Sequence, residues 1–381
     1  MNFSSFFSKI FSRKTSIDWT FFSAALLVVL FGLITMSTFT GNNLFLKKQI
    51  ISLFVALGAF FLATRMDTDI LKRTNVLVAL FLFVSFLLLV LFGLGHVAKG
   101  AQSWFKIGLF AFEPVDAMKL VLILVLAKYF SRRHVEIAHF RHILVSGVYA
   151  FIPFVLVLFQ PDFGSAMIIF FVWFGLILVS GISKKHLALV FLSGAIVFGG
   201  LWMSILKPYQ KARILTFVHP LSDIRGTGYN AYQSTIAIGS GQWLGKGVGY
   251  GTQSRMRFLP EYQTDFIFSA FAEEWGLVGV AILFVLFFVI VGRILVVAQV
   301  LATNFEILYA IGVAILIIAP FVVNIGMTIG LLPVTGVAVP FMSYGGSHLL
   351  IEFIALGLLV SMKKGSRPAH PSALKNEFLG V

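Results

Sequence analysis

The segment that organises this chain, residues 207–276, reads KPYQKARILTFVHPLSDIRGTGYNAYQSTIAIGSGQWLGKGVGYGTQSRMRFLPEYQTDFIFSAFAEEWG. It is the one long polar interval in a sequence that is otherwise almost continuously apolar. Its many glycines permit positive φ angles and a close approach of the backbone to a ligand. A loop this long is usually either functional or disordered, and its tyrosines and apolar residues argue against disorder. We therefore expect binding and catalytic residues here.

The composition on either side of this segment is that of an integral membrane protein. Of the 381 residues, 59% are hydrophobic and 12% are charged, whereas soluble domains carry about 25% charged residues. Apolar runs of about 20 residues recur, as helical spans require, while barrel strands would give shorter segments of alternating polarity. The sequence therefore predicts an all-α, polytopic membrane helical bundle. The absence of cysteine excludes disulfides and thiolate chemistry.

The net charge of +14 is distributed as membrane orientation requires, which argues against nucleic acid as a partner. Basic residues cluster in short segments between the apolar runs. About ten transmembrane helices are predicted, near residues 19–36, 49–64, 75–94, 114–130, 143–159, 165–182, 187–205, 266–293, 306–327 and 348–362. The positive-inside rule then predicts cytoplasmic termini and an extracellular long loop between the seventh and eighth helices.

The predicted organisation has three parts. They are a cytoplasmic segment over 1–17, a single transmembrane domain over 18–363 with its extracellular loop at 206–264, and a cytoplasmic tail over 364–381. The eighth span is longer than a bilayer needs at 1.5 Å per residue, so its first turns should protrude or tilt strongly. Segment 326–347 is rich in glycine and proline, which predicts broken backbone lying against protein or a water-filled cavity.

Asp265 stands where the long loop becomes the eighth span. One interpretation is that Thr264 or Asp265 caps that helix and complements its dipole. The other makes Asp265 a general base, because a carboxylate at the rim of an apolar cavity loses solvation and becomes more basic. Glu273 and Glu274 follow two turns later, and we expect them to sit at the membrane interface.

Two further groups of charged residues have both a structural and a functional interpretation. Glu113, Asp116 and Lys119 open the fourth span at a spacing of three, which places them on one helix face. Asp116 and Lys119 could simply pair, or Lys119 could face an interior cavity and meet an anionic group such as a phosphate. Asp162 lies in the turn QPDFG, which its proline and glycine would form unaided; if it faces the bundle, it adds an acidic or metal-binding position.

Several strings taken together resemble the SEDS family of polytopic membrane proteins. They are GAQSW at 100–104, QPDFGSA at 160–166, QSTIAIGSGQWLGKGVGYGTQS at 233–254, FLPEYQTDFIF at 258–268, AEEWG at 272–276, and IGMTIGLLPVTGV with PFMSYGGS within 325–347. The GTQS and FLPE strings resemble the elongation branch of the family more than its division branch.

The resemblance implies a peptidoglycan glycosyltransferase of the bacterial cytoplasmic membrane. Such an enzyme polymerises lipid II at the outer face during rod-shape elongation, together with a class B penicillin-binding protein (a transpeptidase) and other elongation complex components. The resemblance implies Asp265 as the catalytic residue, and a divalent cation, magnesium or manganese, held by Asp162. The substrate-binding residues it implies are Glu113, Asp116, Lys119, Asp162, Ser343 and Tyr344.

The chain departs from the family pattern at two places. Glu113, Pro114, Val115 and Asp116 stand where the family usually has glutamine, proline, serine and glutamate, and Ser103 stands where it often has arginine. If that arginine grips phosphate, another cation must replace it, and Arg213 is the candidate.

Three alternatives stay open. They are a flippase for lipid-linked precursors, a division-specific polymerase, and a non-enzymatic scaffold. The sequence shows no two-fold repeat, and the candidate charges crowd toward the outer side, both of which argue against a transporter.

Overall fold

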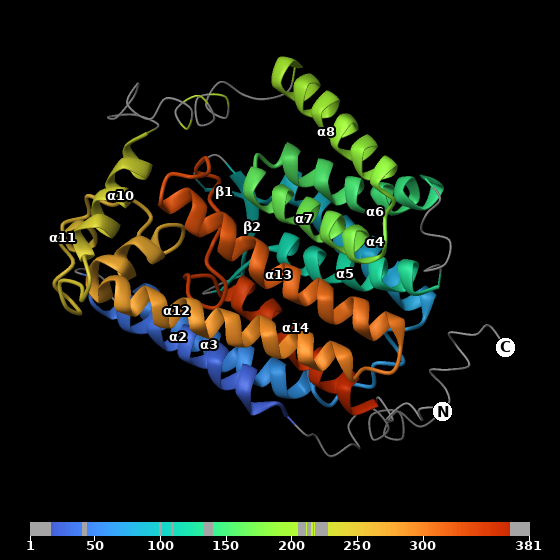
Figure 1. Cartoon of the computed structure of the whole chain (residues 1–381), viewed down its shortest axis with the longest axis horizontal. Coiled ribbons are helices and arrows are strands. Elements are labelled where there is room, and N and C mark those ends of the chain that lie inside the picture. Colours follow the sequence, from blue (N-terminus) through green and yellow to red (C-terminus); the bar gives the residue numbers. More distant parts are fainter. Residues whose placement is uncertain are drawn as a thin grey trace.

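The computed structural model describes residues 17–39, 44–98, 101–107, 110–132, 140–204, 211, 215, 217 and 228–365, and within these it is predominantly helical (Figure 1). The described helices, in chain order, are α2 (Trp19–Ser37), α3 (Leu44–Ala63), α4 (Thr74–Leu94), α5 (Pro114–Ser131), α6 (Phe140–Phe159), α7 (Phe163–Val179), α8 (Lys184–Ser204), α10 (Tyr229–Gly241), α11 (Thr252–Arg255), α12 (Ile267–Gln299), α13 (Asn304–Thr328) and α14 (Gly346–Gly365).

A helix occupies each place where the sequence predicts a span, so the all-α bundle is confirmed. Among the described residues, seven helices are long and apolar enough to cross a membrane: α2, α3, α4, α6, α12, α13 and α14. Helix α7 is apolar but shorter, at 17 residues. The number of ten spans and the orientation of the bundle remain predictions, as do the boundaries of the three parts of the chain.

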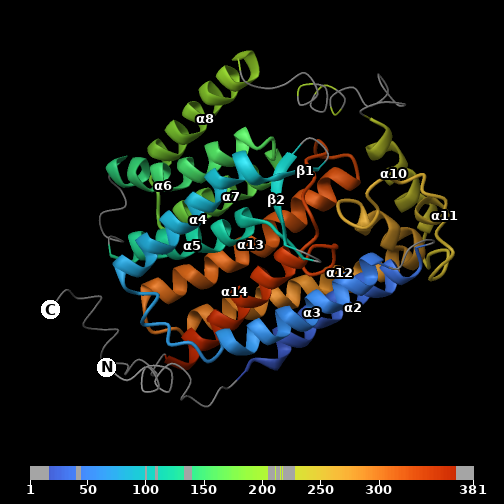
Figure 2. The ribbon, with the colours of Figure 1, turned by 180° about the vertical axis from the view of Figure 1, so that it is seen from behind.

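The bundle has a buried centre made of α5, α13 and α14. Most residues of α5 are buried, and α13 and α14 are the most buried of the candidate spans. Helices α2, α3 and α12 cover one side of this centre and α4, α6 and α7 the other, whereas α8 stands at the edge with most of its side chains exposed (Figures 1 and 2). Small residues permit the closest packing, since a Cβ on Gly357 of α14 would press on the Phe60 carbonyl of α3.

A small antiparallel sheet, which the sequence did not predict, leads into α5. Its strands are β1 (His96–Ala98), β2 (Ala101–Ile107) and β3 (Phe110–Phe112), in the order β1-β2-β3. Strand β3 runs directly into Glu113 and Pro114, so the sheet fixes where α5 begins.

Helix α12 is interrupted, which corrects the prediction of one continuous span. Gly276 has φ 63° and ψ −167°, so the helix consists of two pieces joined at this residue. The loop after α10 fills the break, because the N–H groups of Leu277 and Val278 donate to the carbonyls of Gln242 (2.9 Å) and Trp243 (3.1 Å). A Cβ on Gly276 would collide with the backbone nitrogen of Gly245. Only glycine combines this φ with this approach.

The segment between α13 and α14, residues 329–345, is irregular, as its glycines and prolines predict. It folds back into the bundle, where Val339 and Phe341 are buried and the Met342 carbonyl lies against Gly32 of α2. The predicted loop 206–264 also has structure, since α10 and α11 lie within it. The irregular segment and the structured part of this loop both lie beside the first turns of several helices.

Candidate active site

Four helices, α5, α7, α12 and α14, begin at the same end of the bundle and converge there. The Ser347 hydroxyl of α14 accepts from the Glu113 N–H (3.1 Å) and donates to the Glu113 carbonyl (3.2 Å), which joins the start of α14 to the start of α5. A Cβ on Gly164 of α7 would press on the Thr335 carbonyl of the irregular segment. Neither α5 nor α12 has a side-chain cap. Converging helix N-termini present N–H groups and positive dipole ends to an anion.

Asp265 is half-buried and lies directly before α12. The helix begins at Ile267 with Phe266 in the N-cap position, so Thr264 and Asp265 both lie before the capping position. Thr264 instead turns its hydroxyl back toward Glu261. A Cβ on Gly336 would lie 3.5 Å from Oδ2 of Asp265, so this carboxylate faces the irregular segment across the site.

The backbone around Asp265 is pinned at three successive carbonyl oxygens, those of residues 263–265. They accept from the Tyr344 N–H (2.9 Å), the Ser343 hydroxyl (2.7 Å) and the Asn324 amide (2.7 Å), respectively. The same Asn324 Nδ2 donates to the Val337 carbonyl at 2.6 Å, and the Ser343 Oγ accepts from the Val339 N–H at 2.8 Å. Two side chains therefore each tie the Asp265 backbone to the facing wall of the site.

A buried charge cluster, made of Asp116, Lys119, His348 and Glu352, lies where α5 meets α14. Lys119 Nζ lies 3.0 Å from Asp116 Oδ1, which confirms the predicted pair. His348 lies between the two acids, with Nδ1 at 3.5 Å from Asp116 Oδ1 and Nε2 at 2.9 Å from Glu352 Oε1. Glu352 Oε2 accepts from the Phe341 N–H at 2.8 Å. The cluster thus connects Lys119 to the irregular segment that faces Asp265.

Asp162 belongs to the same end of the site. Its side chain caps α7 by accepting from the Ser165 N–H at 3.0 Å, as its turn sequence indicated. It also lies within electrostatic range of Glu113 and Lys119. Among the described residues, no group of three or more His, Asp and Glu side chains lies together as a metal site. Proteins often bind Mg²⁺ through only one or two carboxylates plus substrate phosphates, so the predicted cation at Asp162 stays a prediction.

The remaining predicted residues have mixed outcomes. Ser343 is buried and its hydroxyl makes two hydrogen bonds, so it holds backbone together. Tyr344 is half-buried, with its ring edge-on to Phe45 at a centroid distance of 5.0 Å. Arg213 lies outside the described residues. Ser103 is buried within β2.

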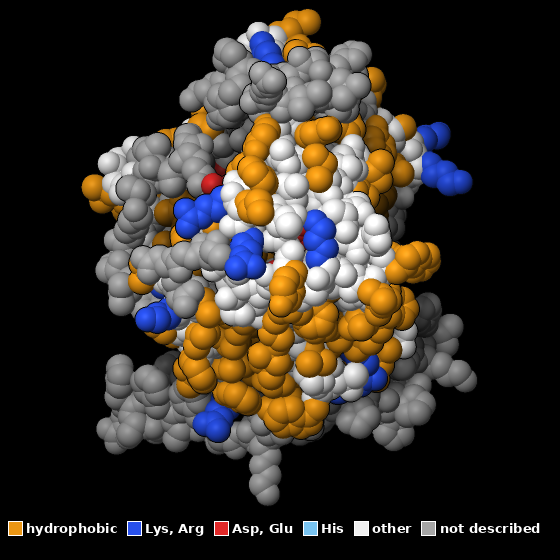
Figure 3. All heavy atoms as spheres, turned by 90° about the vertical axis from the view of Figure 1, so that its left-hand side faces the viewer, with side chains coloured by type: hydrophobic (Ala, Val, Ile, Leu, Met, Phe, Trp, Pro, Cys, Tyr) orange, Lys and Arg blue, Asp and Glu red, His pale blue; other side chains and the backbone are white. Residues whose placement is uncertain are grey.

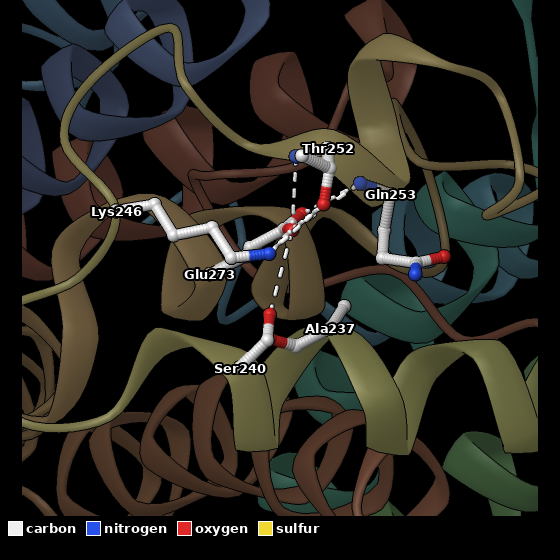
Figure 4. A network of polar contacts seen from close by, with 6 residues as sticks. All are labelled: Ala237, Ser240, Lys246, Thr252, Gln253 and Glu273. Atoms are coloured by element: carbon white, nitrogen blue, oxygen red, sulfur yellow. Dashed lines mark hydrogen bonds and ion pairs between the residues drawn. The ribbon is translucent and has the colours of Figure 1, made fainter.

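Sequence reasoning missed the contacts of Glu273, which is fully buried within the protein. It receives Lys246 Nζ at 2.7 Å, the N–H groups of Thr252 (2.9 Å) and Gln253 (3.0 Å), and the Ser240 hydroxyl at 3.4 Å (Figure 4). The carboxylate therefore fastens the glycine-rich loop onto α12. The sequence did contain a signal for this contact. It was a glutamate on an apolar helix, together with the single lysine of the glycine-rich loop.

Glu274 is also buried and has a related role. Its Oε1 accepts from the Thr38 hydroxyl at 2.6 Å and from the Gly249 N–H at 3.2 Å, so it ties the end of α2 to the same loop. Asn324, His348 and Glu352 were missed altogether. Asn324 is a single polar residue on an apolar helix, whereas His348 and Glu352 have the i,i+4 spacing of a helical pair, which was the available signal.

The outer surface of this end mixes exposed hydrophobic and basic side chains. Figure 3 shows Lys and Arg side chains among large hydrophobic ones, with few acidic groups in view. The exposed hydrophobic residues of the loop around α11 are Trp243, Leu244, Val248, Tyr250, Met256 and Phe258. A face of this kind is suited to contact with a membrane surface or another protein.

The fold and the site together define a multi-pass membrane protein with a polar, charged site at one end of an apolar bundle. The chain belongs to the cell cycle protein family FTSW_RODA_SPOVE, whose profile matches residues 14–367, and it is a multi-pass protein of the bacterial inner membrane. The predicted family resemblance is confirmed.

Curated relatives cover most of the chain. Stage V sporulation protein E of Bacillus subtilis is 32% identical over 368 residues, covering 93% of this chain and 99% of its own length. The peptidoglycan glycosyltransferase MrdB of Escherichia coli is 36% identical over 283 residues, covering 74% and 76%. The probable peptidoglycan glycosyltransferase FtsW of Pasteurella multocida is 32% identical over 338 residues, covering 85% and 82%.

Two solved structures share the fold. A chain from a peptidoglycan synthase complex that coordinates polymerization and crosslinking has a TM-score of 0.80 at 27% identity. The rod shape determining protein RodA of Thermus thermophilus has a TM-score of 0.68 at 25% identity. In both cases the match covers 92% of this chain and 98% of the other.

Proposed function

We propose that this protein polymerises lipid II into glycan strands at the outer face of the cytoplasmic membrane, with Asp265 as the general base. Relatives named peptidoglycan glycosyltransferases support the reaction class. The observation that carries the proposal is the half-buried carboxylate of Asp265, which faces Gly336 at the end where four helices begin.

The reaction follows from this position. The acceptor sugar hydroxyl gives its proton to the Asp265 carboxylate, and its oxygen forms a bond to the anomeric carbon of the donor. The bond between that carbon and the diphosphate oxygen breaks, and the lipid diphosphate leaves as an anion. A half-buried base is suited to this step because partial loss of solvation makes a carboxylate more basic.

The leaving diphosphate requires positive charge, which the uncapped N-termini of α5 and α12 supply in part. The charge cluster adds Lys119, but its residues together with Glu113 and Asp162 bring four carboxylates against two basic side chains. Carboxyl groups therefore outnumber basic side chains where the diphosphate would enter. A divalent cation, magnesium or manganese, held by Glu113 and Asp162 would supply the missing charge and stabilise the departing anion.

The partner in this proposal is a class B penicillin-binding protein that crosslinks the strands within the elongation complex. Support comes from the solved chain of a peptidoglycan synthase complex, which this chain resembles over 92% of its length. The exposed hydrophobic and basic face around α11 offers a surface for such a partner. The GTQS and FLPE strings favour elongation over division.

The test is polymerisation of labelled lipid II by the purified protein. We expect glycan strands from the wild-type protein and none from Asp265→Asn, which keeps the size of the side chain but cannot take a proton at neutral pH. An Asp265→Asn variant that folds and polymerises at the full rate would rule the proposal out. Translocation of label across vesicles without strands would indicate a flippase instead, and neither activity would indicate a scaffold.

A further inference from the structure

The short segment that carries Asp265 lies outside the hydrogen bonding of α12. The N–H groups of Ser269 and Ala270 both donate to the Phe266 carbonyl, so this is the first acceptor of the helix. The carbonyls of residues 263–265 precede it and accept from other elements. The direction in which the Asp265 side chain leaves the backbone therefore depends on those acceptor contacts and not on α12 alone.

Asn324 is the most constrained of the donors. It is fully buried on α13, and its Nδ2 donates both hydrogens, to the Asp265 carbonyl at 2.7 Å and to the Val337 carbonyl at 2.6 Å. The opposite orientation would turn the amide oxygen toward two carbonyl oxygens, so the surroundings fix which atom points where. One NH₂ group thus sets the separation between the Asp265 backbone and the facing wall.

Ser343 repeats this arrangement one residue earlier. Its hydroxyl donates to the Thr264 carbonyl at 2.7 Å and accepts from the Val339 N–H at 2.8 Å. Gly336, the residue opposite the Asp265 carboxylate, lies directly before the wall residues that the two side chains hold.

We infer that Asn324 and Ser343 form a clamp whose function is to hold the Asp265 carboxylate at its working position against the wall formed by residues 336–339. This inference rests on the proposed function and adds two positioning residues to it. A base must lie within hydrogen-bond reach of the proton it takes, and an error of about 1 Å can cost on the order of 100-fold in rate. Neither side chain has a hydrogen left to donate to substrate.

The decisive variants are Asn324→Asp and Ser343→Ala. The first keeps the size of the side chain but turns oxygens toward two carbonyls, and the second removes one hydroxyl. We expect kcat for lipid II polymerisation to fall by about 10- to 100-fold for Asn324→Asp, with KM changed by less than about threefold. The kcat of Ser343→Ala should fall by a smaller factor, since one clamp residue remains.

Thr328→Val is the matched control. Thr328 is buried on the same helix, and its hydroxyl donates within the helix to the Asn324 and Ile325 carbonyls without touching residues 263–265. It should keep the wild-type kcat. Each rate is divided by the fraction of protein that binds lipid II, so that misfolded protein does not count as slow enzyme. If Asn324→Asp gives no monodisperse protein, Ser343→Ala decides alone.

The outcomes separate the clamp from the function it serves. A wild-type kcat for Asn324→Asp or, failing that, for Ser343→Ala would overturn the clamp while leaving the base intact, provided Asp265→Asn is inactive. A rise in KM that accounts for the whole loss would overturn it as well, because the residues would then act in binding. Full activity of Asp265→Asn would remove the proposed function itself.

Discussion

At the scale of single residues, the charge cluster explains how α5 tolerates a short acid. Asp116 stands where the family usually has glutamate, yet its Oδ1 lies 3.0 Å from Lys119 and 3.5 Å from His348. His348 reaches across from α14 and Glu352 lies behind it, so the cluster closes without a longer side chain. Sequence reasoning could find the Asp116–Lys119 pair because it is local, but not the contact between Asp116 and His348, which lie more than 200 residues apart in the chain.

This arrangement predicts that the Asp116–Lys119 pair has two separable roles. The pair of charges stabilises the fold, and the positive charge of Lys119 serves the reaction. Asp116→Asn leaves a buried lysine without its carboxylate, which should lower the free energy of unfolding by about 3 kcal/mol. The double variant Asp116→Asn, Lys119→Met removes both charges and should recover most of that loss. It should still fail to polymerise lipid II, because the cation for the diphosphate is gone. Thermal unfolding in detergent and strand synthesis measure the two effects, and a stable, fully active double variant would contradict the role of Lys119.

The excess of carboxylates predicts dependence on a divalent cation. Chelation should abolish strand synthesis, and Mg²⁺ or Mn²⁺ should restore it. Asp162→Asn should raise the cation concentration needed for half-maximal activity about tenfold or more, since one charged ligand is lost. Asparagine caps helices as well as aspartate does, so α7 should remain intact. A chelator-resistant enzyme, or an unchanged cation requirement in Asp162→Asn, would exclude this site.

At the scale of elements, the two pieces of α12 show a feature that local sequence patterns do not predict. Length and apolarity predicted the helix, but a glycine inside a helical pattern is ordinarily tolerated and does not announce a break. The break exists because the loop at 242–247 hydrogen-bonds to the backbone of residues 273–278, and Glu273 and Glu274 fasten that loop from the side. The partners come from another part of the chain, so no window of sequence contains the signal.

The break can be tested with two glycines of the same helix. Gly276→Ala would place a side chain at positive φ and against the Gly245 nitrogen, so we expect a loss of stability of more than about 2 kcal/mol and faster proteolysis of the loop around α11. Gly292→Ala is the control, because a Cβ there meets nothing within 4 Å. It should be neutral or stabilising by up to about 1 kcal/mol. Equal effects at both positions would show that the loop does not depend on the break.

At the scale of the whole molecule, the sequence predicted the class, the bundle and the family, because composition and long strings are properties of the entire chain. It could not predict how the ends are fastened. Opposite the candidate active site, Asp18 before α2 receives Arg293 of α12 at 2.6 Å and Lys363 of α14 at 3.3 Å. Lys72, between α3 and α4, lies 2.9 Å from both Asp69 and Glu306. These ion pairs connect the helices at the end remote from the chemistry.

Their titration defines a pH window for stability. Burial alone would raise the pKa of Asp18, but the hydrogen bonds and charges of Arg293 and Lys363 outweigh it, so the pKa lies below its ordinary value of 3.8. Burial alone would lower the pKa of Lys72, but Asp69 and Glu306 outweigh it, so the pKa lies above 10.5. A lowered acid stabilises the fold above its ordinary pKa and loses that contribution as the pH falls. A raised base stabilises it below its ordinary pKa and loses that contribution as the pH rises.

Asp18→Asn should therefore lower stability at pH 7 by about 1 to 3 kcal/mol, less than a fully buried pair would lose, because Arg293 is 38% exposed. The difference from the wild-type protein should shrink below about pH 4, as protonation removes the same charge from the unsubstituted chain. Asp69→Asn is the control, since its 67% exposed carboxylate should contribute little at any pH. Because the ion pairs lie at the opposite end from Asp265, the strand synthesis rate per folded molecule should not change in Asp18→Asn. A rate that fell in proportion to the lost stability would show that the two ends are coupled through α12 and α14.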